Sequence, residues 1–269
     1  MDYRKQFAVK PGTKVKLSKW DPDETLGERK GPKAEKKLEK LVARLDELQY
    51  VLYAEKKHAI LIVFQAMDAG GKDGTIRHVM SGLNPQGCSV TSFKQPSPEE
   101  LAHDYLWRVH KAVPEVGFIG IFNRSQYEDV LIVRVHELVP KEIWSKRYDE
   151  INSFEKYLAE NRVTIVKFYL HISEEEQKKR FYARLEDPDK QWKISQADYS
   201  ERKYWDKYVK AYEDALTRCS TKDAPWYIIP GNKKWFRNLA VSHILVETLE
   251  ELKMKIPKPT VDIKDLKLK

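Results

Sequence analysis

Five short apolar runs, spread along the 269-residue chain, constrain its fold more than any other feature. They are rich in β-branched residues, and their apolar character is continuous rather than alternating. The runs cover residues 59–65, 88–94, 117–123, 163–172 and 226–230. Continuous apolarity is typical of parallel strands buried on both faces, and the segments between the runs are long enough for crossover helices. The sequence therefore predicts an α/β fold with a doubly wound, parallel, five-stranded sheet flanked by helices.

The segments around these runs predict how the chain is organised. Residues 1–32 are rich in Lys, Pro and Gly, which indicates an irregular N-terminal arm. From residue 33 onward, leucines at helical spacing predict a core-facing helix, which opens a main domain over residues 33–255. Residues 256–269 are expected to form a C-terminal tail.

Composition excludes several classes of protein. No apolar run approaches the roughly 20 residues of a membrane span, and the first residues lack the apolar core of a signal peptide. We therefore expect a cytoplasmic protein with no membrane partner. The only two cysteines, Cys88 and Cys219, are too far apart in sequence to suggest a metal knuckle. The net charge of +8 is consistent with a polyanionic partner, although many enzymes are this basic for solubility alone.

The loop after the first predicted strand carries the clearest functional signal. The stretch DAGGKDGTI, residues 68–76, resembles the phosphate-binding pattern G-x-x-x-x-G-K-[ST], but Asp73 occupies the hydroxyl position and Ala66 the position of the first glycine. Glycines let the backbone approach an anion, the helix start adds partial positive charge, and Lys72 adds a full charge. The alternative is an ordinary glycine-rich turn with a solvated lysine. The predicted phosphate contacts besides Lys72 are Ala69, Gly70, Gly71, Asp73, Gly74 and Thr75.

Asp68 is the first candidate metal ligand. A carboxylate beside a phosphate site repels the substrate unless a cation lies between them, so this position favours a bound metal ion. The alternative is a turn-forming Asp that bonds its own backbone. Asp73, in contrast, is expected mainly to start the helix, where the helix dipole favours a carboxylate.

The end of the third predicted strand, with the sequence IFNRSQYEDVL, supplies three further candidates. Asn123 can ligate or orient a metal but brings no charge, so Glu128 is the nearest source of a second carboxylate. Glu128 has an equally good alternative role, because Ser125 and Glu128 have the spacing of a capping box. Arg124 is placed to bridge to a phosphate or, alternatively, to form a surface ion pair.

The segment after the fourth predicted strand collects positive charge. Two arginines lie four residues apart on one helix face, where like charges repel unless an anion offsets them. The helix then breaks at Asp187-Pro188, and two lysines follow. This arrangement predicts a lid over about residues 178–200 that closes over phosphates; the alternative is a simple pair between Glu176 and the first arginine. The four cations are Arg180, Arg184, Lys190 and Lys193.

Four separated stretches together resemble the second family of polyphosphate kinases. They are DAGGKDGTI, FNRSQYEDVL, DPDKQWKIS and APWYIIPGNKKWFRNLAV, and the resemblance extends from about residue 10 to about residue 252. The N-R-S-x-Y-E-D form resembles the class III branch. The resemblance implies a P-loop kinase-like catalytic domain, similar to thymidylate kinases, that transfers phosphoryl groups between inorganic polyphosphate and adenine or guanine nucleotides. It also implies Mg²⁺, or alternatively Mn²⁺, as cofactor and assembly into a homo-oligomer, with no nucleic acid as partner.

The resemblance also assigns roles to individual residues. Asp68 and Lys72 match the family's metal-binding and phosphate-binding positions, whereas Asn123 replaces an Asp found in other branches. Lys94, at the exit of the second predicted strand, lies where kinases of this fold hold the acceptor nucleotide. The expected mechanism is direct in-line transfer, in which Lys72, Arg124 and the lid arginines neutralise charge on the transferred group.

Two alternative functions stay open. One is an ATP-dependent nucleoside or nucleotide kinase on the same fold, which the missing hydroxyl after Lys72 argues against. The other is a non-enzymatic nucleic-acid-binding protein, which would explain the positive charge but not a carboxylate at Asp68 beside a phosphate loop.

Overall fold

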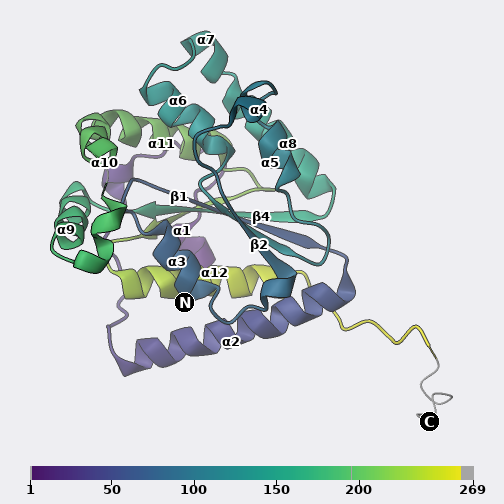
Figure 1. Cartoon of the computed structure of the whole chain (residues 1–269). Helices are drawn as coiled ribbons and strands as arrows, with labels where there is room; N and C mark the ends of the chain where they lie inside the picture. The colour runs from purple at the N-terminus through teal and green to yellow at the C-terminus, as the bar shows by residue number, and fades with distance from the viewer. Residues whose placement is uncertain (1, 195, 262–269) are drawn as a thin grey trace.

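A parallel sheet forms the centre of the molecule, as Figure 1 shows for this computed structural model, which describes residues 2–194 and 196–261. Within these residues the sheet has five strands in the order β2-β3-β1-β4-β5, with β1 at its centre. All neighbouring strands pair in parallel. The predicted doubly wound five-stranded α/β fold is confirmed. The strands are β1 (Ala59–Ala66), β2 (Cys88–Ser92), β3 (Ile119–Asn123), β4 (Val163–His171) and β5 (Trp226–Pro230).

Burial explains why these runs form strands. Every residue of β1 is buried, and its register places Ile62 beside Ile121 of β3 and Val166 of β4. Successive residues of β1 point to opposite faces, so Leu61 contributes to one core and Ile62 to the other. The edge strand β2 differs, because none of its residues is fully buried.

Helices cover both faces of the sheet. One face packs against the long helices α2 (Pro32–Glu55) and α12 (Lys234–Glu251), together with α3 (Lys72–Val79) and α1 (Tyr3–Phe7). The other face packs against α8 (Arg147–Glu160) and α11 (Trp205–Cys219). The shorter helices are α4 (Pro98–Leu101), α5 (Trp107–Lys111), α6 (Ile132–Val135), α7 (Lys141–Trp144), α9 (Glu174–Leu185) and α10 (Gln196–Glu201). Short 3₁₀ turns are Leu17–Lys19, Pro85–Gly87, Gln126–Val130, Pro188–Lys193 and Arg202–Tyr204.

The N-terminal segment packs along the sheet edge and α12. Apart from α1, an isolated bridge at Ala8 and the turn at Leu17–Lys19, its described residues are irregular. The backbone of Val9 donates to the carbonyl of Trp226, and the Tyr3 ring stacks on His243 with centroids 4.3 Å apart. At the other end, residues 262–269 of the predicted tail lie outside the described residues. No helix in the described part of the chain is long and apolar enough to cross a membrane.

Candidate active site

The loop between β1 and α3 has the backbone of an anion-binding turn. Ala69 and Gly71 both have positive φ, at 58° and 96°, and α3 begins directly afterward at Lys72. A Cβ on Gly70 would lie 2.7 Å from the Met67 carbonyl oxygen, so a side chain does not fit there. Because the first amides of a helix are free to bind anions, the loop presents backbone N–H groups at this point.

Lys72 is folded back over its own loop. Its Nζ donates to the Ala66 carbonyl at 3.1 Å. Burial lowers the pKa of Lys72, and Arg124 lowers it further, while the carboxylates of Asp68 and Glu128 oppose this shift. Lys72 and Arg124 therefore lie near one another, with the carboxylates of Asp68 and Glu128 beside them.

Two consecutive residues at the end of β3 hold the two loop carboxylates. Arg124 Nη2 lies 3.3 Å from Asp68 Oδ1, and Asn123 Nδ2 donates to Asp73 Oδ1 at 2.7 Å. Arg124 has a positive φ of 63°, and its amide donates to the carbonyl of Phe64 in β1. The structure thus brings together Asp68, Asn123 and Arg124, as the strand-end argument predicts.

Glu128 lies in the turn after β3 and faces the same loop. Burial raises the pKa of its carboxyl group, and Arg124 and Lys72 oppose this rise. Ser125 Oγ accepts from the Tyr127 amide, and among the bonds of residues 2–194 and 196–261 none joins the Glu128 carboxylate to the Ser125 amide. The capping box considered for Ser125 and Glu128 is therefore not formed. The reason is that the turn is 3₁₀ rather than α-helical, so Ser125 caps two residues ahead instead of three.

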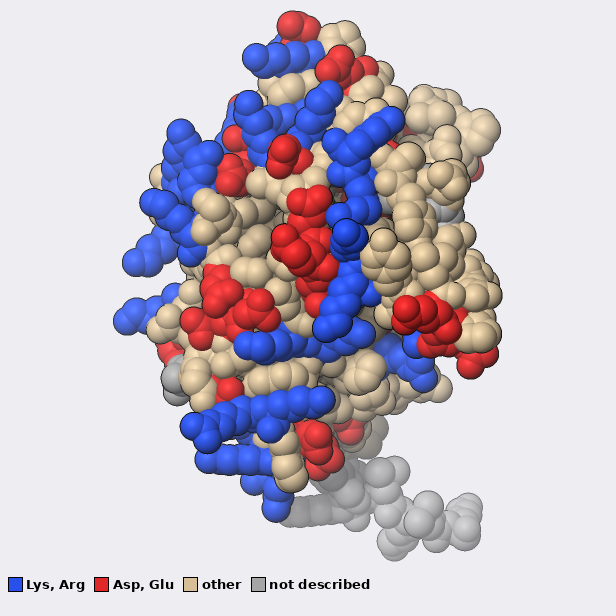
Figure 2. Space-filling view, turned by 90° about the vertical axis from the view of Figure 1, so that its left-hand side faces the viewer, with Lys and Arg blue, Asp and Glu red and all other residues tan. Residues whose placement is uncertain are grey.

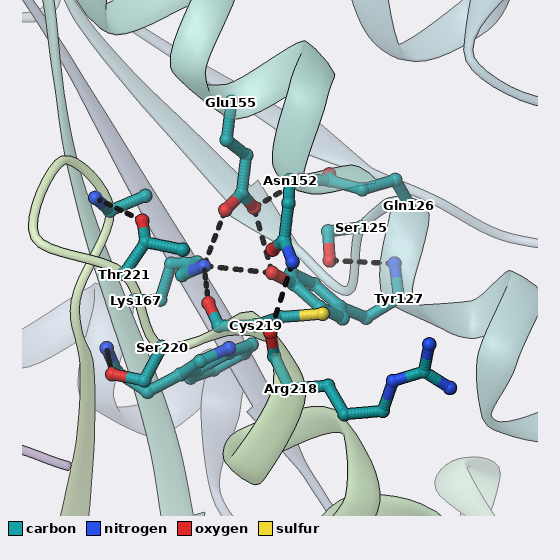
Figure 3. A network of polar contacts seen from close by, with 12 residues as sticks. Ser125, Gln126, Tyr127, Asn152, Glu155, Lys167, Arg218, Cys219, Ser220 and Thr221 are labelled. Atoms are coloured by element: carbon teal, nitrogen blue, oxygen red, sulfur yellow. Dashed lines mark hydrogen bonds and ion pairs between the residues drawn. The ribbon is translucent and has the colours of Figure 1, made fainter. Parts of the chain in front are cut away.

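A buried polar network joins the turn Gln126–Val130 to α8 and β4 (Figure 3). Glu155 on α8 accepts from Gln126 at 3.0 Å and from the Tyr127 hydroxyl at 2.9 Å. Lys167 on β4 pairs with Glu155 and also donates to the Tyr127 hydroxyl and to the Cys219 carbonyl, each at 2.7 Å. Both charged side chains are buried, with exposed fractions of 0% and 1%. Arg124 and Glu128 therefore flank residues that are anchored to two layers of the fold.

Two cavities meet at this turn. The smaller has a volume of about 240 Å³ and is lined by Asp68, Tyr208 and Tyr212 among others. The larger has a volume of about 830 Å³ and opens between residues 93–96, which follow β2, and the helices α4 to α8. Their linings share three residues, which are Arg124, Glu128 and Ile132. A guanidinium and a carboxylate therefore stand at the boundary between two adjacent binding spaces.

The larger cavity combines apolar surface with charges of both signs, since four Lys or Arg and five Asp or Glu side chains line it. Phe93 and Ile143 supply apolar lining, and Lys94 also lines the cavity. Arg147 pairs with Asp129 at 2.9 Å, and burial raises the pKa of Asp129 to about 6 although Arg147 opposes this. An apolar cavity with a few polar groups is the usual form of a site for a planar, charged ligand.

The four cations of the predicted lid make different contacts. Arg180 is buried, and its guanidinium donates to the carbonyls of Ala69 at 3.0 Å and Gly231 at 2.6 Å and to Glu176 at 2.8 Å. Arg184 stacks on the Phe181 ring, Lys190 pairs with Asp187, and Lys193 lies 5.0 Å from the Trp192 ring centre. Ser195 in the lid range lies outside the described residues. The pairing of Glu176 with Arg180 considered from the sequence is present, and Arg180 fastens the phosphate loop to the turn after β5.

Several site residues were not assigned from the sequence. Gln177 Nε2 donates to the Asp68 carbonyl at 2.9 Å, and Tyr208 and Tyr212 line the smaller cavity. Arg108 and Arg147 line the larger one. No motif in the sequence marks these positions.

The donor set at the loop suits a hard divalent cation. In the described part of the chain, no group of three or more His, Cys, Asp and Glu side chains could hold a metal ion. Asp68 and the Asp73–Asn123 pair nevertheless place oxygen ligands around the phosphate loop. Mg²⁺ is commonly bound by one or two carboxylates, with water and substrate phosphates completing its shell, so this donor set fits.

Comparison with known proteins agrees with this geometry. Residues 28–257 match the family described as Polyphosphate kinase 2 (PPK2). The AMP/ADP-polyphosphate phosphotransferase of Meiothermus ruber is 53% identical over 95% of this chain and 96% of its own length. The ADP-polyphosphate phosphotransferase of Rhodopseudomonas palustris is 50% identical over 95% and 93%. The crystal structure of Polyphosphate Kinase 2 from Arthrobacter aurescens TC1 superposes with a TM-score of 0.93 at 44% identity, covering 98% of this chain and 94% of that one.

Proposed function

This chain belongs to the polyphosphate kinase 2 family, and on that premise we propose that it moves phosphoryl groups between inorganic polyphosphate and the adenine nucleotides AMP and ADP. The observation that carries the proposal is the shared boundary of the two cavities at Arg124 and Glu128. A phosphotransferase needs a donor site and an acceptor site that meet where the group is passed on. Here the phosphate loop borders one space, and an apolar, nucleotide-sized space lies beside it.

In the proposed reaction, the donor phosphates lie on the loop and the acceptor phosphate reaches the boundary from the larger cavity. Lys72 and Arg124 neutralise the negative charge of the transferred group, and the loop amides orient it. Transfer in line between two oxygens needs no covalent intermediate on the protein. The buried network under Tyr127 keeps Arg124 in place, so little reorganisation is needed during the step.

The acceptor is proposed to lie with its base against the apolar lining of the larger cavity. Arg108 and Arg147 then supply positive charge for its phosphates, and Lys94 adds a third cation at the cavity wall. Arg108 lies 5.4 Å from the Phe93 ring centre and donates to the Lys94 carbonyl at 2.9 Å, so its position is fixed by packing as well as by charge.

Mg²⁺ is the proposed cofactor, with Mn²⁺ as an alternative. Asp68 would hold it, assisted by Asn123 or Glu128, and when bound it would screen the phosphates from the loop carboxylates and from one another. The contact between Arg124 and Asp68 occupies only one carboxylate oxygen, so Asp68 keeps an oxygen for a ligand.

One assay separates the proposal from its alternatives. The protein is incubated with AMP or ADP, Mg²⁺ and long-chain polyphosphate, and in parallel with ATP and a nucleoside. We expect ADP or ATP to form only in the first mixture. Product formed only from ATP and the nucleoside would indicate an ATP-dependent kinase, and no product in either mixture would reject a phosphotransferase.

The proposal extends to a homo-oligomer in the cytoplasm, with nucleic acid not a partner. The homo-oligomer is supported by the family resemblance and by the edge strand β2, where Val90 is 55% exposed. Exposed strand edges with apolar side chains are usual places of chain association. Light scattering after size-exclusion chromatography tests it, and a monomeric mass at micromolar concentration would contradict it.

A further inference from the structure

A second buried arginine lies behind the phosphate loop. Arg237 belongs to α12, and only 2% of its surface is exposed. A Cβ on Gly71 would overlap its Nη1 and would lie 3.2 Å from its Cζ, and a Cβ on Gly74 would lie 3.7 Å from its Nη2. The guanidinium of Arg237 therefore packs directly against the backbone where α3 begins. Gly71 is needed there both for its positive φ and for the space that the guanidinium takes.

This arginine has no counter-ion in the described part of the protein. Its Nε and Nη2 donate to the neutral Asn238 side chain at 3.2 and 3.0 Å, and its buried Nη1 has no hydrogen-bond partner. Burial, and then the charge of Arg180, lower the pKa of Arg237 to about 9. The guanidinium is therefore held in a place where its positive charge is disfavoured.

The surroundings of Arg237 add positive potential rather than removing it. Arg180 Nη1 would lie 3.5 Å from a Cβ on Gly71, so two guanidinium groups flank the same glycine. Burial lowers the pKa of Lys234, and Arg180, Arg237 and Lys190 lower it further. The partial positive charge at the start of α3 adds to the positive potential around Arg237. On the outer surface, Figure 2 shows Lys and Arg in a band on the side that carries α9 and α10.

A buried charge without a partner destabilises a fold unless something compensates it. We infer that the missing counter-ion of Arg237 is the bound phosphate chain of the donor, so that Arg237 raises the affinity of the loop for polyphosphate through its field. This inference rests on the proposed function and names an electrostatic contributor to donor binding. Arg237 acts across the loop backbone, because its Nη1 is closed off from solvent.

The inference predicts that removing the charge of Arg237 does not lower the stability of the ligand-free protein but weakens its binding of the donor. Replacing Arg237 by Met removes the charge and keeps an unbranched side chain. Loss of an uncompensated buried charge is expected to leave the melting temperature of the ligand-free protein unchanged or higher. The same change should raise the KM for polyphosphate by roughly ten- to a hundredfold, the effect of one unit charge acting across a backbone layer at an effective dielectric constant near 20. The KM for AMP should stay within about twofold.

The experiment compares Arg237→Met and Arg237→Gln with wild type and with the control Arg218→Met. Arg218 lies on α11 and is 40% exposed, so its loss removes the same charge away from the loop. Melting temperatures are measured alone and with tripolyphosphate, because a ligand that binds the folded state stabilises it. We expect tripolyphosphate to raise the melting temperature of wild type and the control, and to raise that of the Arg237 variants much less.

Each other result has a definite meaning. An unchanged polyphosphate KM and an unchanged tripolyphosphate effect in Arg237→Met overturn the inference. Failure of both the Met and the Gln variant to fold also overturns it, because the charge would then be part of the apo fold. If wild type itself does not transfer phosphoryl groups from polyphosphate, the proposed function fails; if wild type is active and the Arg237 variants match it, only this inference fails.

Discussion

The buried pair of Lys167 and Glu155 allows a prediction with a defined magnitude. The change is Lys167→Met, which keeps an unbranched side chain but removes the positive charge from the centre of the sheet. Glu155 would then remain buried without a counter-ion, which costs about 3–5 kcal/mol. The Cys219 carbonyl would also lose the donor that lies 2.7 Å away, which adds about 1–3 kcal/mol. We therefore expect the free energy of unfolding to fall by about 4–8 kcal/mol, a large part of the roughly 5–15 kcal/mol usual for a folded protein.

The second variant tests whether the loss comes from the orphaned charge. Glu155→Gln in the Lys167→Met background leaves no charge buried, and the Gln carbonyl still accepts from Gln126 and Tyr127. This double substitution should cost only about 1–3 kcal/mol, since only unpaired polar groups remain. The two single substitutions and the double one form a cycle, and their non-additivity gives the coupling energy of the pair. Urea unfolding followed by circular dichroism measures all four proteins.

The pH dependence gives an independent check. Burial raises the pKa of Glu155 in the folded protein, with Lys167 opposing this rise, so without Lys167 the pKa should rise further. A carboxyl group whose folded pKa is raised takes up its proton in the folded state first, and stability therefore increases as the pH falls toward the unfolded value. Lys167→Met should thus recover part of its loss, relative to wild type, between neutral pH and about pH 5. A loss below about 1 kcal/mol, or additive single effects, would refute the reasoning.

Two further predictions concern the loop and the N-terminal arm. Lys72→Met should lower kcat by at least about a hundredfold in steady-state assays. The melting temperature should change little, because Lys72 contacts only the Ala66 carbonyl among the bonds described. Near-normal turnover would reject the phosphate-loop assignment. Burial lowers the pKa of His243 to about 4, so the unfolded state binds a proton first and wild type should lose stability as the pH falls from about 6.5 toward 4. His243→Phe, which keeps a ring against Tyr3, should lose less over that range, and identical melting curves across these pH values would contradict this.

The sheet could be predicted because its signal is local. Continuous apolar runs mark strands that are buried on both faces, and β1 is buried along its whole length. The strand ends of a parallel sheet meet at one edge, so Asp68 and Arg124 could be expected to lie together although 56 residues separate them. Strand β2 lies at the exposed edge of the sheet, where none of its residues is fully buried.

The polar partners could not be predicted in the same way, because they come from distant elements with no periodic signal. Arg180 and Arg184 share a helix face at a spacing of four, which suggested a common role. Yet Arg180 turns inward to the carbonyls of Ala69 and Gly231, whereas Arg184 stacks on Phe181. A single lysine within an apolar strand likewise gives no hint of its partner, and Lys167 finds Glu155 only because α8 packs across β4.

The two unusual features of the loop sequence are connected through β3. A loop of the common type has a hydroxyl after its lysine, whereas this chain has a carboxylate there and another carboxylate before the glycines. Asn123 binds the first, at Asp73, and Arg124 binds the second, at Asp68. A charged Asp at position 123 would face Asp73 and repel it. A neutral amide at 123 and a carboxylate at 73 are therefore compatible with each other.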